Sequence, residues 1–216
     1  MADTTAPEFE RFVKAQRSAK RIADAPHAMA AGDVAHAVFV EDAKTSELLR
    51  VSARRAAGLF RPTEHTEAVW VNGANELAIN LTDMHMKSLD GLVIVGIPVR
   101  CDQVGDALVE VGFAVGSPDQ PAGMFAATYN RPNGPPLIID VWGDSLVAFA
   151  WECLLGMVTD IAGAVGKDAR GNVLVPVEVN ASRKGLQIVP MARHRFTGSS
   201  GLTVPVAPIA SAGGQQ

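Results

Sequence analysis

The feature that most constrains the fold of this chain is an apolar run at residues 146–165. About 20 apolar residues suffice to cross a bilayer as a helix. Glu152 and Asp160 interrupt the run, and each carboxylate would cost a few kcal/mol at the bilayer centre. The run therefore predicts a buried core helix and no membrane insertion.

This core helix is expected to begin after Gly143-Asp144-Ser145, with Asp144 or Ser145 as its N-cap, and to end by Gly166. Its buried face is expected to be apolar throughout. The residues predicted to be buried are Leu146, Phe149, Ala150, Leu154, Met157, Val158 and Ile161.

The rest of the chain predicts an α+β fold, in which short strands follow one another without intervening helices. Such a succession is typical of an antiparallel β-meander, here of about five to seven strands packed against the helix at 145–165. The segments with strand patterns, of which about five to seven are expected in this sheet, are residues 35–40, 67–71, 76–81, 91–100, 108–115, 124–129, 137–142, 173–179 and 185–189.

Three local signals refine this sheet. Asn72-Gly73 predicts a tight hairpin turn, Pro98 predicts a strand end at an edge or a bulge, and the apolar run 137–142 predicts a central strand. Residues 173–179 and 185–189 are expected to form a closing hairpin.

Two amphipathic helices are expected in the N-terminal part, at about residues 1–62. The first begins near Pro7 and ends before Pro26, with a basic outer face. The second spans about residues 45–57, with Thr45 or Ser46 as N-cap and Gly58 at its end. We therefore expect a single domain at residues 1–196, followed by an extended tail at 197–216 rich in Pro, Gly, Ser and Ala.

The composition limits the compartment and the classes of partner. The chain has 216 residues, of which 48% are apolar and 19% charged, as in a globular protein. Its polar N-terminus lacks the apolar run of a signal peptide, and its two cysteines are too few for a disulfide scaffold. We expect a soluble protein in the cytoplasm, or in a particle assembled inside a cell.

The net charge of −4 conceals an asymmetry, because residues 62–150 carry eleven Asp/Glu and only three Lys/Arg. Nucleic-acid binding is not expected, since it usually requires a much stronger basic excess. The asymmetry is either ordinary surface charge or a device by which acidic and basic regions of neighbouring copies attract each other.

Gly143-Asp144-Ser145-Leu146 resembles the first sequence block of the Gly-Asp-Ser-Leu family of serine hydrolases. In that family the serine ends the first strand and is the nucleophile, so the resemblance implies a hydrolase that uses Ser145, here with His194. The later Asp-x-x-His block of the family is missing, because Met191 stands three residues before His194. A helix N-cap requires the same residue types at 144 and 145.

No cofactor or metal site is predicted. The densest His/Asp group is Asp83-Met84-His85 with Asp90, in an expected loop, and ordinary loop residues explain it. Asp140 and Glu152 interrupt apolar segments. They would share a proton or bind a cation if both were buried, but we expect each to face solvent or meet an arginine, for which Arg193-His194-Arg195 is a candidate.

The tail holds an aliphatic segment at residues 202–209, in which two prolines forbid a helix. The residues expected to contact a partner are Leu202, Val204, Val206 and Ile209. They would bind a neighbouring copy or their own domain. The function expected from these features is a non-catalytic subunit of a homo-oligomeric or larger protein assembly, of the kind found in a phage particle. The alternative is a small serine hydrolase that uses Ser145 with His194.

Overall fold

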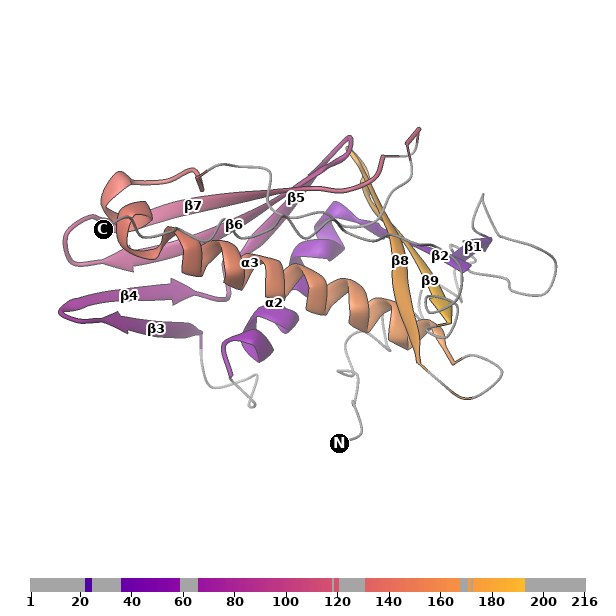
Figure 1. Ribbon diagram of the computed structural model, residues 1–216, viewed down its shortest axis with the longest axis horizontal. Helices are drawn as coiled ribbons and strands as arrows, with labels where there is room; N and C mark the ends of the chain where they lie inside the picture. Colours follow the sequence, from indigo (N-terminus) through magenta and orange to yellow (C-terminus); the bar gives the residue numbers. More distant parts are fainter. Residues whose placement is uncertain are drawn as a thin grey trace, which may run out of the picture.

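The computed structural model describes residues 22–24, 36–58, 66–117, 119–120, 131–167, 171 and 173–192. In this part of the chain, two antiparallel sheets pack with a long helix, α3, and a shorter helix, α2 (Figure 1). The α+β class with antiparallel strands is therefore confirmed. The first sheet consists of β1 (Ile22–Asp24), β2 (His36–Glu41), β9 (Gly185–Ala192) and β8 (Leu174–Ser182), in that order.

The second sheet contains β3 (Glu67–Asn72), β4 (Asn75–Asn80), β5 (His85–Leu89), β6 (Leu92–Cys101) and β7 (Gly105–Ala114). Its order is β3-β4-β6-β5, and β7 pairs with the other side of β6. The predicted single meander is wrong, because the strands form two sheets. The closing hairpin β8–β9 joins β2, and β6 lies between β4 and β5 in the second sheet. The sheets meet where Gly116 donates to the Val179 carbonyl at 2.9 Å and accepts from Ala181 at 2.8 Å.

Helix α3 spans Pro136–Val165, and this range corrects the prediction of a strand at 137–142. Pro135, with φ −58° and ψ 130°, is its N-cap, and Pro136 suits the first helical position because its missing N–H would be unpaired there anyway. Ile138, Ile139 and Trp142 are buried at helical spacing. A short continuous apolar run does not by itself distinguish a strand from a helix. Here the run is part of a helix, and its three buried residues lie on one face of that helix.

The predicted burial on α3 is confirmed. Phe149 is 5% exposed and the other six predicted residues are 0% exposed. The helix packs against α2, β8 and β9. By length and a mean hydropathy of 1.5, α3 would suit a membrane span, but half of its apolar window is buried inside the protein. Core helices of globular proteins show the same composition.

Helix α2 spans Asp42–Ala56 and starts about one turn before the predicted residue. The predicted cap at Thr45 or Ser46 is wrong. Thr45 donates its hydroxyl back to the Asp42 carbonyl at 2.7 Å, and Ser46 contacts the backbone of Met86 on β5. The predicted end is confirmed, because Gly58 has a φ of +74° and its N–H donates to the Arg55 carbonyl at 2.9 Å.

Two predictions fail because pairing between distant segments overrides a local pattern. Residues 22–24, expected at the end of the first helix, form β1 and pair with β2. Pro98, expected at a strand end, lies inside β6 opposite Leu108. On the other side of β6, β5 pairs as far as Gly96 and β4 pairs from Val99. Pro98 therefore occupies a gap in the ladder, where its missing N–H is tolerated.

The remaining predicted elements divide into those observed and those outside the described residues. The strands at 35–40, 67–71, 76–81, 91–100 and 108–115 and the closing hairpin are confirmed with small shifts of their ends. The first helix before residue 22, the strand at 124–129, the cluster Arg193-His194-Arg195 and the tail at 197–216 lie outside the described residues.

Candidate interaction site

The outer edge of β3 is the first component of the candidate site. Asn72 pairs with Asn75 across the two-residue turn Gly73-Ala74, and Gly73 has a φ of +62°, which confirms the predicted hairpin. Closing residues of such a hairpin exchange backbone hydrogen bonds, and the bonding alternates along the ladder.

This alternation fixes which backbone groups of β3 face outward. Asn72 and Trp70 direct their N–H and C=O groups toward β4. Thr66 lies an even number of residues from both and points the same way, because its carbonyl accepts from Leu81 at 2.8 Å. Glu67, Val69 and Val71 therefore direct their backbone groups away from the sheet. Within the described part of the chain, no strand pairs with that edge.

The outward positions of β3 also carry exposed apolar side chains. Val69 is 59% exposed and Val71 is 65% exposed. An exposed apolar edge strand is a template for another strand, and proteins usually cover such edges or place Lys or Pro on them. β3 has neither Lys nor Pro.

Other edges of the same sheet are covered. On β5, the Met86 N–H donates to the Ser46 hydroxyl at 3.0 Å, and just before β5 the Met84 carbonyl accepts from Arg50 at 2.8 Å. On β7, Glu110 exchanges two backbone hydrogen bonds with Asn133. Among the described residues, β3 is therefore the edge of this sheet that lacks such contacts.

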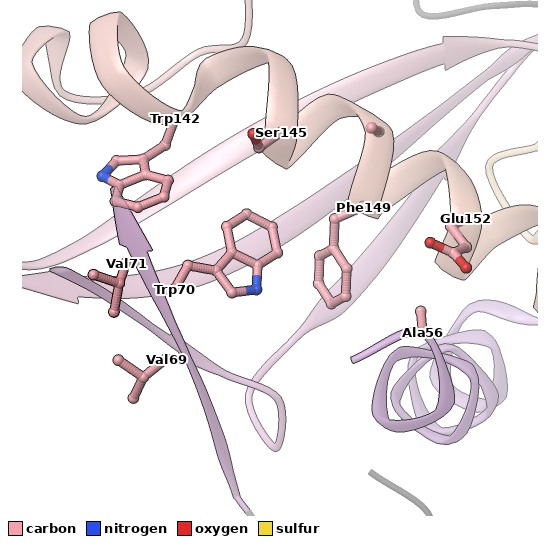
Figure 2. A pocket seen from close by; sticks show the side chains of 9 residues that line it. Ala56, Val69, Trp70, Val71, Trp142, Ser145, Phe149 and Glu152 are labelled. Carbon is pink, nitrogen blue, oxygen red and sulfur yellow. The ribbon is translucent and has the colours of Figure 1, made fainter. Parts of the chain in front are cut away.

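A groove beside β3 is the second component of the site. Trp70 points toward α3, whereas Val69 and Val71 point away (Figure 2). The Trp70 ring lies 6.2 Å from Trp142 and 5.4 Å from Phe149, in the second case edge to face, a favoured aromatic geometry. The aromatic contacts hold β3 against α3. The groove has a volume of about 620 Å³, and its lining includes Ala56, Ala148, Ser145 and Glu152.

Ser145 lies in the interior of α3 with its side chain exposed. The predicted N-cap role at Asp144 or Ser145 is therefore wrong, because the helix begins nine residues before Ser145. The local structure also differs from the hydrolase family that the four residues resemble, in which the serine ends a strand. The groove lining contains no histidine among the described residues. His194 lies outside the described residues, so its pairing with Ser145 stays a prediction.

Because Ser145 is an exposed residue inside a helix, Ser145→Ala is expected to leave stability unchanged or raise it by up to about 0.5 kcal/mol, since alanine has the higher helix propensity. An N-cap serine would instead lose about 1 kcal/mol on the same change. Urea unfolding of the two proteins measures the difference. A loss of 1 kcal/mol or more would show that Ser145 makes a contact that its position in α3 does not explain.

A second, smaller hollow lies on the outer face of the first turns of α3. Its volume is about 280 Å³, and its lining includes Pro132, Asp140 and Asp144. Asp140 forms an exposed ion pair with Arg131. An arginine partner was predicted for Asp140, but the candidate named was the cluster at 193–195. Glu152 is also exposed. Asp140 and Glu152 are twelve helical residues apart, about 18 Å, and they form no joint site.

The described residues contain no cluster of three His, Cys, Asp or Glu side chains that could hold a metal ion. His85 begins strand β5 instead of lying in the expected loop, and its ring packs directly over Gly96 of β6. Burial raises the pKa of the Cys153 thiol far above its usual value, and neighbouring Glu152 raises it further. The thiol is therefore protonated and a poor nucleophile.

The sequence contained a signal for this site that the strand assignment alone missed. Ala68-Val69-Trp70-Val71 is apolar on both faces of β3, whereas its partner β4 alternates polar and apolar residues. An edge strand with two apolar faces indicates contacts on both. Comparison of the chain with known protein families, with curated proteins and with solved structures gives no significant match.

Proposed function

We propose that this chain is a non-catalytic subunit of a homo-oligomeric assembly, and that the outer edge of β3 is its contact with another protein chain. The observation that carries the proposal is the pair of exposed valines, Val69 and Val71, on a strand edge without a partner among the described residues. A row of outward backbone groups flanked by apolar side chains suits an added strand better than a small molecule.

The charge distribution supports a second copy as the partner. The strands β3 to β7 lie within the strongly acidic region at 62–150, and the segments on either side of it are basic. Opposite charges on neighbouring copies favour association and orientation. A particle assembled in the cytoplasm, such as a phage particle, is the setting in which we place this subunit.

Val69→Lys tests the proposal. The substitution places a charge on the proposed contact, and we expect the apparent dissociation constant of the oligomer to rise at least about tenfold, or about 1.4 kcal/mol. Sedimentation velocity over a range of concentrations measures it. The matched control is Leu137→Lys on α3, because Leu137 is 61% exposed and lies outside the proposed contact.

Thermal unfolding of both variants checks that the fold is retained, as expected for such exposed positions. A wild-type chain that remains monomeric at all concentrations would overturn the proposal. Equal effects of the two lysine substitutions would show that β3 is not the contact.

A further inference from the structure

We infer that the segment covering the β3 edge is the aliphatic tail of a neighbouring copy, residues 202–207, added as an antiparallel strand. This inference rests on the proposed function and names the partner of the same edge. The inference rests on the positions of the prolines, the alternation of apolar residues, the absence of charge in the tail, and the length of the chain between β9 and the tail.

The prolines select one way for the tail to pair. In a strand, the backbone groups of successive residues point to opposite sides. Pro205 has no N–H, so a ladder through Thr203, Pro205 and Ala207 would lack a donor at its centre. The ladder must run through the even positions, with Pro205 facing solvent. Pro208 falls on an even position, and its missing N–H ends the ladder after residue 207.

The same choice places the large aliphatic side chains beside the exposed valines. In an antiparallel pair, residues that face each other lie on one face of the sheet. Leu202, Val204 and Val206 therefore share the face of Val69 and Val71, which are the exposed side chains of β3. The usable tail segment has six residues, as has β3. In the register that pairs residues 202–206 with residues 67–71, Val204 lies opposite Val69, and Leu202 lies opposite Val71.

The charge of the tail favours it over a second β3 strand on this edge. Residues 197–216 contain no ionisable side chain. Pairing of β3 with its own copy would instead bring two Glu67 and two Glu76 side chains onto one face, where the Arg100 of each copy already pairs with its own Glu67. The tail adds no like charge to this face.

The length of the connection favours a neighbouring copy over the same chain. Ala192, the last residue of β9, pairs with Leu174, and Val173 bridges to Lys167 just beyond the end of α3. Trp70 lies instead against Trp142, about 34 Å back along the helix axis. In Figure 1 the β3–β4 hairpin and the β8–β9 hairpin accordingly lie at opposite ends of α3.

Nine residues lie between Ala192 and Leu202, so the ten Cα–Cα steps from one to the other reach at most about 36 Å. In the antiparallel register Leu202 lies at the far, turn end of β3. The chain's own tail would have to run straight and fully extended to arrive there. A neighbouring copy imposes no such restriction.

Two proline substitutions in adjacent residues test the pairing. Val204→Pro removes an N–H that faces β3, and we expect the apparent dissociation constant of the oligomer to rise about tenfold or more. Thr203→Pro removes an N–H that faces solvent, and we expect a change of less than about threefold. Sedimentation velocity measures both. Equal effects would overturn the strand register, and oligomers unchanged by Val204→Pro and by deletion of 198–216 would overturn the tail as occupant.

Cross-linking decides between the copies. Chains with Val69→Cys are mixed with chains with Val204→Cys and treated with a short bismaleimide, while the native Cys101 and Cys153 are buried. We expect covalent dimers in the mixture. A third chain carries both substitutions, and cross-links that form only within its monomer would overturn the neighbouring-copy inference.

The outcomes also separate this inference from the proposed function. If the oligomer survives tail deletion but dissociates with Val69→Lys, the β3 edge is the contact but another segment occupies it. If the wild-type chain is monomeric, the proposed function itself fails.

Discussion

Leu154→Ala is expected to lower the free energy of unfolding by about 2–5 kcal/mol, because it leaves a cavity at the centre of the core. Leu154 is 0% exposed and lies on α3, which packs against α2, β8 and β9. For a chain of this size, each kcal/mol lowers the melting temperature by roughly 2–4 °C. The expected decrease is therefore on the order of 10 °C by calorimetry.

Leu155→Ala is the matched control, because the neighbouring Leu155 is 40% exposed. Here the expected loss is below about 1 kcal/mol, since a large part of the side chain already contacts water. Similar losses for the two substitutions would mean that the buried face of α3 is assigned wrongly.

Gly185→Ala is expected to destabilise the protein by about 2–5 kcal/mol, through backbone strain and a steric clash together. Gly185 has a φ of +142°, and a Cβ atom there would lie 2.1 Å from the Val40 carbonyl oxygen. Gly185 pairs with Glu41 where β9 meets β2. The clash is with backbone, so the two strands would have to separate.

Gly105→Ala separates the two contributions. Gly105 has a φ of +77°, but no atom lies within 4 Å of the position of an added Cβ. Its expected cost is about 1–2 kcal/mol, from strain alone. Urea denaturation of both variants gives the difference, and equal losses would remove the proposed clash between β9 and β2.

An unpaired strand edge can pair with strands of other chains, so the proposed subunit requires control over what binds to β3. The proposed occupant is supplied by the chain itself, so contact forms only when copies meet. A head-to-tail contact of this kind closes into a ring or a reciprocal dimer, or it continues as a filament. The mass of the oligomer would distinguish the closed forms from the open one.

The local patterns determined most of the described strands, the hairpins β3–β4 and β8–β9, and the buried face of α3. Alternation in β4, the turn at Asn72-Gly73 and the spacing of Leu154, Met157 and Ile161 depend on neighbours within one or two turns. Such short-range signals are carried by the sequence itself. Even the apolar faces of β3 were visible there, although their meaning required knowledge of the sheet edge.

Only the tertiary structure decided the rest, because the partners are distant in sequence. The run at 137–142 is helical, and its Trp142 packs against Trp70, which lies 72 residues away in the sequence. Residues 22–24 became a strand by pairing with β2, and Pro98 fits inside β6 because β4 and β5 leave a gap beside it. The exposure of Val69 and Val71 follows from β3 being last in its sheet. Strand order is set by the burial of whole faces, and no local pattern encodes it.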